Sequence, residues 1–313
     1  MQRVLATMVA ALMTVTAAQA AETVKIITPF AAGGPADMLA RLLAQELAPR
    51  IGSDVVVENR GGGGGIIGTE AVARSPADGR TLLVGSLGSH VISPNLRGQL
   101  SYNPLQSFAP VAMFGSVPSV LVVSPKVPVD NLPALIALAR QQNLKYGSAG
   151  PGTTMNISGE LLNSAAGVKT THVPYRGAGP AINDLLGGHI DFLIADFPVL
   201  LPLINAKSVR GLALFGKERS PMLADVPTTA ELGYGDAVME NWYGVLAPAG
   251  MAPEAKEKLD AAVLAALRAP AMQERLATAG LRGTLDSAAF RSKLTTDFAY
   301  WETAIKKLGI TGE

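Results

Sequence analysis

The 313-residue chain has no cysteine, few aromatic residues (5%) and a net charge of only +1. The lack of cysteine excludes disulfide bonds, thiolate catalysis and thiolate metal ligands. A near-neutral charge without a basic run argues against nucleic-acid binding, and so few aromatic side chains provide no stacking platform for single strands. An anion bound by this protein is therefore expected to be held by backbone dipoles.

After the N-terminus, no stretch is long and apolar enough to cross a bilayer. The first twenty residues combine Arg3, a short apolar run and the small-residue sequence Ala18-Gln19-Ala20. This pattern predicts a signal peptide at residues 1–20, cleaved after Ala20, and hence a periplasmic protein. The remaining chain of roughly 290 residues is long enough for two lobes, and 48% of the sequence is hydrophobic.

Strand and helix patterns alternate in the first part of the mature chain. Strands are predicted at 24–27, 55–58 and 81–84, with helices at 36–47 and 66–74. This βαβαβ alternation indicates an α/β protein with a parallel sheet. Residues 86–106 are predicted to form a loop, and 110–123 paired strands interrupted at Pro118. Residues 181–186 are predicted to form a helix, and 241–247 a strand that crosses back to the first half.

Two glycine-rich stretches each connect a predicted strand to a predicted helix, at residues 26–43 and 146–162. Pro35 lies near the first helical position of one, and a hydroxyl of Thr153 or Thr154 can cap the other. Because unpaired N–H groups at a helix N-terminus carry partial positive charge, each stretch is a candidate carboxylate or phosphate site. If the copies belong to different lobes, they face one another across a cleft. The alternative is that both are ordinary strand-to-helix turns.

The strand predicted at 190–195 is followed directly by Asp196 and Phe197. Ligands of open α/β sheets bind outside the carboxyl ends of strands, so both residues are candidates for the cleft. The alternative is a solvated acid in a turn. Arg176, beside Gly177, is a candidate partner for a carboxylate, with a solvated loop arginine as the alternative.

A glycine run at residues 61–68 supports a competing function. Its pattern Gly63-x-Gly65-x-x-Gly68 before a helix formally matches a dinucleotide fingerprint, and would make the chain an oxidoreductase. However, residues 58–60 separate the strand from the run, and no acidic residue for a ribose follows the next strand. An export signal also conflicts with a cytosolic nicotinamide cofactor. We therefore expect no cofactor.

Hydrolytic and metal-dependent catalysis are not predicted either. No serine lies in a G-x-S-x-G motif, and His90, His172 and His189 show neither an orienting pattern nor clustered acids. We therefore expect no catalytic residue and no metal site.

Six segments distributed in order along the mature chain carry a family resemblance. They are PFAAGGPADMLARLL, VVVENRGGGGGIIGTEAVARSPADGRTLL, YGSAGPGTT, HVPYRGAGPAINDLLGGHIDF, RSPMLADVPTTAELG and NWYGVLAPAG. Together they resemble the Bug family, the periplasmic solute receptors of tripartite tricarboxylate transporters. The resemblance implies an α/β, type II periplasmic-binding-protein fold with one lobe formed by residues 21–122 and 243–313 and the other by 123–242.

The resemblance also implies a ligand and a set of contacts. In the family, the glycine loop of each lobe holds a ligand carboxylate, partly through bridging waters. With the loop and strand-end patterns above, it places the ligand-binding residues at Phe30, Ala32, Gly33, Gly34, Ser86, Ser148, Gly150, Gly152, Thr153, Thr154, Asp196 and Phe197. The implied partners are a small organic carboxylate and the permease subunits of the transporter, with the receptor acting as a monomer.

The sequence departs from the family pattern in both glycine loops. Ala31-Ala32 stand where Pro-Pro or Ala-Pro often precedes the first Gly-Gly pair, and Met155-Asn156 replace Ser-His in the second loop. Because a thioether replaces a hydroxyl donor, citrate or acidic amino acids cannot be carried over as ligands. The identity of the carboxylate and of the permease stays open.

Overall fold

The computed structural model describes residues 23–309, so the predicted signal peptide lies outside it. Its strands are β1 (Val24–Thr28), β2 (Val55–Asn59), β3 (Thr81–Ser86), β4 (Phe108–Val123), β5 (Lys145–Ser148), β6 (Thr171–Pro174), β7 (Phe192–Asp196), β8 (Arg210–Leu214) and β9 (Glu240–Pro248). Its α-helices are α1 (Pro35–Ile51), α2 (Ile66–Ala73), α3 (Ser93–Leu96), α4 (Leu132–Gln141), α5 (Thr154–Ala166), α6 (Ala178–Gly187), α7 (Phe197–Asn205), α8 (Pro253–Arg268), α9 (Pro270–Thr278) and α10 (Ser287–Leu308). Within the described range, no helix is long and apolar enough to span a membrane.

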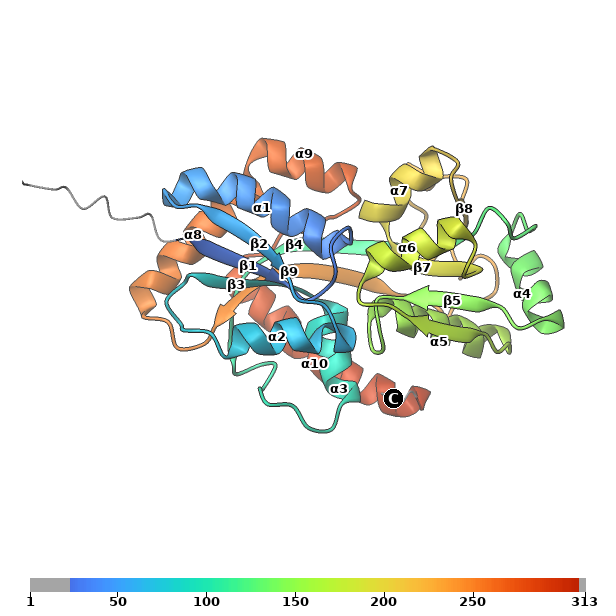
Figure 1. Cartoon of the computed structure of the whole chain (residues 1–313), viewed down its shortest axis with the longest axis horizontal. Helices are drawn as coiled ribbons and strands as arrows, with labels where there is room; N and C mark the ends of the chain where they lie inside the picture. Colours follow the sequence, from blue (N-terminus) through green and yellow to red (C-terminus); the bar gives the residue numbers. More distant parts are fainter. Residues whose placement is uncertain (1–22, 310–313) are drawn as a thin grey trace, which may run out of the picture.

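The strands form one sheet in the order β2-β1-β3-β9-β4-β7-β5-β6, and β8 also pairs with β4. The sheet has two parts. Sheet A contains β1, β2, β3 and β9 with residues 108–118 of β4, and sheet B contains β5, β6, β7 and β8 with residues 119–123 of β4. Figure 1 shows β4 and β9 running along the middle of the molecule and joining the two parts. The change of partner occurs at Pro118, which pairs with Glu240.

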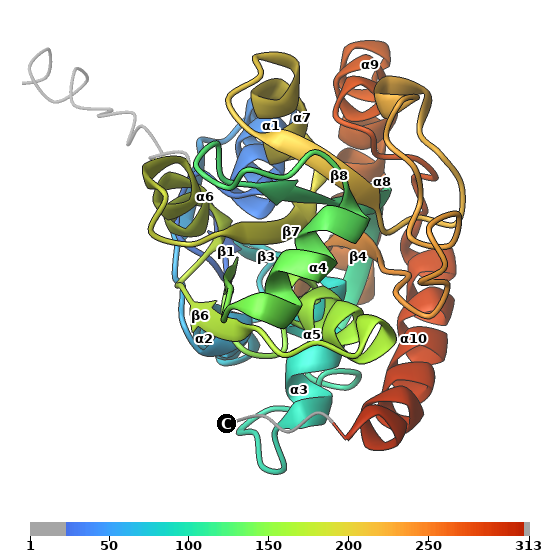
Figure 2. The same cartoon turned by 90° about the vertical axis from the view of Figure 1, so that its right-hand side faces the viewer.

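Helices cover both faces of the sheet. In Figures 1 and 2, α1, α6 and α7 lie on one face, and α2 and α5 lie on the other. The buried apolar residues form two clusters that follow these faces, so each cluster extends through both sheet parts. On α1, Leu39, Leu43 and Leu47 are fully buried at intervals of four residues, which is the stripe expected of an amphipathic helix.

Three sequence predictions differ from this fold. Residues 86–106 are not simply a loop, because they contain a helical turn at Gly88–Ile92 followed by α3. Residues 110–123 form a single strand instead of a pair. Pro118 is tolerated in that strand because it lies where pairing with β9 ends and pairing with β7 begins. Finally, α6 begins at Ala178, three residues before the predicted helix at 181–186, which brings its N-terminus to the site described next.

Candidate functional site

A pocket with an empty volume of about 410 Å³, including its opening, lies where strands of both sheets reach their carboxyl ends. It is lined by Phe30, Gly34, Pro35, Ala36, Ser86, Ala149, Thr153, Thr154, Met155, Ala178, Ala195, Asp196, Asn241 and Tyr243. Its position agrees with the rule that ligands of α/β sheets bind outside the carboxyl ends of the strands. Two connections dominate its wall: the first loop, residues 29–34 before α1, and the second loop, residues 149–153 before α5.

The first loop ends at an uncapped helix N-terminus. Gly34 is the N-cap of α1 and has extended dihedral angles, without a side-chain cap. The N–H groups of Ala36 and Asp37 have no acceptor within residues 23–309. The loop is fixed to the first turn of α1, because the amide of Gly33 donates to Asp37 Oδ2 at 3.1 Å.

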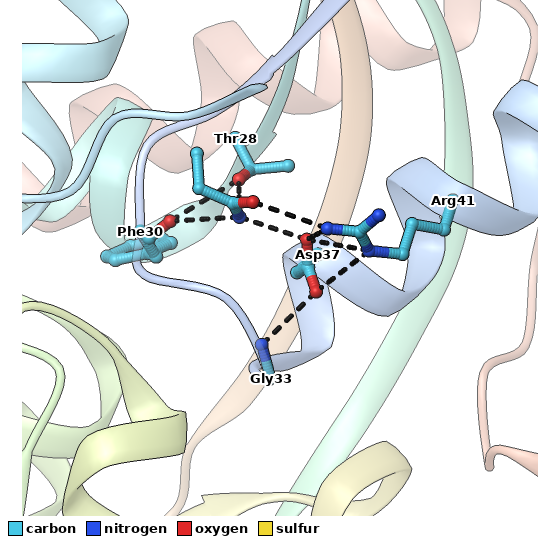
Figure 3. A network of polar contacts seen from close by, with 6 residues as sticks. Thr28, Phe30, Gly33, Asp37 and Arg41 are labelled. Carbon is cyan, nitrogen blue, oxygen red and sulfur yellow. Dashed lines mark hydrogen bonds and ion pairs between the residues drawn. The ribbon is translucent and has the colours of Figure 1, made fainter. Parts of the chain in front are cut away.

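Asp37 is the centre of a polar network that fixes the first loop (Figure 3). Its carboxylate accepts hydrogen bonds from Arg41 Nε at 3.1 Å and from Asn59 Nδ2 at 3.0 Å. The same Asn59 amide also donates to Thr28 Oγ1 and to the carbonyl oxygen of Phe30. Burial acts to raise the pKa of Asp37, but the hydrogen bonds it accepts outweigh this and lower the pKa. Arg41 thus compensates an acidic charge in the first turn of α1.

The second loop ends at a capped helix N-terminus. Thr153 is the N-cap of α5, and its hydroxyl accepts from the Asn156 amide at 3.4 Å while donating to the Gly150 carbonyl at 2.7 Å. The amides of Thr154 and Met155 have no acceptor in the described part of the chain. Because the hydroxyl proton of Thr153 already has an acceptor, the free donors here are backbone amides.

Asn156 has the same role in the second loop that Asp37 has in the first. Its Oδ1 accepts from the Gly152 amide at 3.0 Å, four residues earlier, as Asp37 accepts from Gly33. Its Nδ2 donates to the Tyr146 hydroxyl at 3.0 Å. Asn156, one of the two residues of this loop that depart from the family pattern, is therefore a brace for the loop.

The N-terminus of a third helix, α6, also reaches the pocket, and the sequence analysis did not predict this contribution. Ala178 at its start lines the pocket, and the preceding connection meets the first loop where the Ala31 amide donates to the Arg176 carbonyl at 2.9 Å. Gly177, which precedes the helix in the sequence RGAGP, could have indicated this helix start. The side chain of Arg176 is exposed and does not line the pocket, and the lining residues include no Lys, Arg or His.

Asp196 lines the pocket and is 3% exposed, so the alternative of a solvated turn acid is wrong. Three side chains donate to its carboxylate at 2.6 Å: Ser119 of β4, with Asn241 and Tyr243 of β9. Burial raises the pKa of Asp196 in spite of these hydrogen bonds. The network joins β7 to both strands that connect the sheets, and the sequence alone did not indicate it.

The structure divides the predicted ligand-binding residues into two groups. Those that line the pocket are Phe30, Gly34, Ser86, Thr153, Thr154 and Asp196, and those outside its lining are Ala32, Gly33, Ser148, Gly150, Gly152 and Phe197. Ser148 is fully buried, where its hydroxyl accepts from the Gly150 amide at 3.0 Å and contacts His172 Nε2 at 2.6 Å. Phe197 is buried in the first turn of α7. These two residues are placed to support the site.

The histidines are dispersed. His90 is completely buried, with Nε2 2.8 Å from the Pro104 carbonyl, and burial lowers its pKa to about 4. His172 contacts Ser148, and His189 lies beside Asp184. Among residues 23–309, no group of three or more His, Asp or Glu side chains is arranged to hold a metal ion.

Comparison with known proteins identifies the family. The model of the "Tripartite tricarboxylate transporter family receptor" (TctC) matches residues 39–310. Protein BugT of Bordetella pertussis is 36% identical over 293 residues, which cover 92% of this chain and 90% of the relative.

Solved structures give the same result. The periplasmic binding protein BugD superposes with a TM-score of 0.88 at 33% identity, covering 92% of this chain and 98% of BugD. An R. palustris protein with adipate has a TM-score of 0.87 at 34% identity, covering 92% and 98%. MatC from Rhodopseudomonas palustris with bound malate has a TM-score of 0.84 at 32% identity, covering 90% and 98%.

These relatives confirm the predicted type II periplasmic-binding-protein fold and the prediction of a receptor instead of an enzyme. The oxidoreductase alternative based on Gly63-x-Gly65-x-x-Gly68 is therefore set aside. The chain belongs to the receptor family of the tripartite tricarboxylate transporters, the Bug proteins.

Proposed function

We propose that this chain is a periplasmic receptor that captures a small organic carboxylate between two lobes and delivers it to a membrane permease. Residues 21–122 and 243–313 form one lobe and residues 123–242 form the other. The change of strand partner at Pro118 supports a division at this part of β4. The protein is exported by a signal peptide cleaved after Ala20 and acts as a monomer.

One observation carries this proposal: the N-termini of α1 and α5 meet at a single pocket with unpaired amides. The free N–H groups of Ala36, Thr154 and Met155 all belong to lining residues. Hydrogen bonds to a charged acceptor contribute about 1.5–3 kcal/mol each, and helix dipoles add to the attraction for an anion. A carboxylate satisfies these donors without a cationic side chain.

The bound solutes of two neighbours support the chemical class. One neighbour contains adipate and another contains malate, and both molecules are small dicarboxylates. The two helix N-termini bind one carboxylate, and the rest of the molecule extends toward Ser86 and Asp196 on the wall contributed by β3 and β7.

A thermal-shift screen with mono-, di- and tricarboxylates tests the proposal, with the methyl esters of each acid as matched controls. A solute bound only by the folded protein stabilises it by about 2.7 kcal/mol at a concentration of 100 times Kd. We expect at least one free acid, and not its ester, to raise the unfolding temperature, with calorimetry giving one site per chain. Absence of a shift with every acid would overturn the proposal.

A further inference from the structure

The glycine run at residues 61–65 has no role in the proposed binding of a carboxylate, but it packs against both loops of the site. It connects β2 of sheet A to α2 and includes a helical turn at Gly63–Gly65. Gly63 and Gly64 both have left-handed backbone angles, with φ of +59° and +65°. Their φ angles are alike, but their surroundings differ.

Gly64 lies directly against the second loop, which belongs to sheet B. A Cβ atom on Gly64 would lie 2.1 Å from the carbonyl oxygen of Pro151, and one on Gly150 would lie 3.2 Å from the Gly64 nitrogen. The Pro151 carbonyl and the Gly64 nitrogen are backbone atoms and cannot rotate away, whereas the Ser93 hydroxyl, 2.7 Å from the same Gly64 Cβ, can turn aside. By contrast, a Cβ atom on Gly63 would meet nothing closer than 3.7 Å.

Two residues of α3 complete the surface under the second loop. Ser93 Oγ donates to the Gly64 carbonyl at 2.9 Å and lies 3.4 Å from the Pro151 carbonyl. A Cβ atom on Gly152 would lie 2.8 Å from Ser93 Oγ and 2.9 Å from a methyl carbon of Leu96. Gly64, Ser93 and Leu96 form a closely fitted seat for Pro151 and Gly152.

We propose that this seat positions the second loop for binding, so that the amides of Thr154 and Met155 face the solute. The inference rests on the proposed capture of a carboxylate between the lobes. The seat belongs to the sheet A side and the loop to the sheet B side, so the contact forms only when the two sides are together. The seat therefore stabilises the solute-bound arrangement, and position 64 must lack a Cβ atom.

Gly64→Ala and Gly63→Ala are a matched pair of variants that test the seat. Both place alanine at a left-handed position, so both lose similar backbone stability, and only Gly64→Ala adds an atom against Pro151. For each variant, unfolding without solute gives the stability. Calorimetry and stopped-flow measurements give Kd and the dissociation rate for the carboxylate that the screen selects, with adipate and malate tested first.

We expect Gly64→Ala to bind roughly 10- to 100-fold more weakly than Gly63→Ala, which is the scale of overpacking a tight contact. Its dissociation should be correspondingly faster, while its unfolding temperature without solute should equal that of Gly63→Ala. Equal affinities in the two variants would overturn the inference. So would a lower stability of Gly64→Ala without solute, because the contact would then be structural.

Ser93→Ala tests the seat a second time, without adding an atom to the contact. Loss of the Ser93 hydroxyl should weaken binding roughly 2- to 5-fold, as expected for one neutral hydrogen bond, and should speed dissociation. Unchanged affinity and dissociation would overturn the seat. If the unaltered protein binds no carboxylate at all, the proposed function itself fails, and that result is distinct from equal binding by the variants.

Discussion

The first and second loops are each fixed by a side chain that accepts a loop amide, but one side chain is charged and the other is neutral. Each ends at a helix N-terminus in the pocket, and each is braced by the third residue of its helix, which accepts the amide four residues earlier. The brace of the first loop, Asp37, is charged and is compensated by Arg41. The brace of the second loop, Asn156, is neutral, and its partners Gly152 and Tyr146 are neutral too.

This difference shows how a site without cationic lining residues limits negative charge around an anion. An aspartate near a helix N-terminus competes with a bound carboxylate unless a cation lies close to it. Arg41 provides that cation behind the first loop. Within residues 23–309 no cationic side chain bonds Asn156, and its partner Tyr146 donates to the carboxylate of Glu160. The two braces should therefore not be interchangeable.

The largest expected effect comes from giving the second loop a charged brace. Asn156→Asp places a carboxylate within the first turn of α5, where the structure provides no compensating cation. Two like charges about 6 Å apart repel by about 2–3 kcal/mol at an effective dielectric constant near 20, so calorimetry should show affinity falling roughly 30- to 100-fold. Asn143→Asp, the same change at an exposed site before β5, is the control and should bind normally.

The next effect concerns the stability that the charged brace provides. Asp37→Ala removes the acceptor for Gly33, Arg41 and Asn59 and should lower the free energy of unfolding by about 2 kcal/mol, the scale of buried donors left unpaired. Asp236→Ala removes an exposed acid without a side-chain hydrogen bond in the described structure and serves as the control. Equal stability of the two variants in a urea titration would show that the network does not hold the first loop.

A smaller effect is expected from the cap of α5. Thr153→Val removes the hydroxyl and should reduce stability by about 1 kcal/mol, the usual loss for an N-cap. Affinity should change less than about threefold, because the hydroxyl proton is donated to Gly150 and not to the pocket. An affinity loss of roughly 1.5–3 kcal/mol would instead show that the hydroxyl turns to bond the solute.

The smallest effect is a dependence on pH. The folded-state pKa of Asp37 is lowered below its ordinary value of 3.8, so ionisation of this group stabilises the native state above that value. This contribution is lost as pH falls through the lower folded-state pKa. Asp37→Asn should therefore lose less stability than the unaltered protein between pH 5 and the acid transition in about the pH 2–4 range. Parallel stability curves would show that Asp37 is not the group responsible.

The sequence was sufficient to predict the fold class and both glycine loops, because these depend on local patterns. Strand, glycine turn and apolar helix stripe follow one another within the segments at 26–43 and 146–162, and the structure contains β1 with α1 and β5 with α5 there. Short or uniformly apolar helices were harder to predict from the sequence. The helix α7 reads FPVLLPLIN, which has little polar periodicity and two prolines, and it was not predicted.

The side chains that complete the site could not be predicted, because their partners are distant in the sequence. Asp196 meets Ser119, Asn241 and Tyr243 only when β7, β4 and β9 are adjacent. The pairing of Gly64 with Pro151 likewise depends on the approach of the two sheets. No local pattern indicates such contacts.

A crystal structure with the carboxylate identified by the screen is the most direct test of the central claim that amides from both helix N-termini hold the solute. The account predicts one carboxylate within about 3.2 Å, or one bridging water, of the amides of Thr154 or Met155 on one side and Ala36 on the other. A solute carboxylate paired instead with Arg176 or another cationic side chain would contradict it.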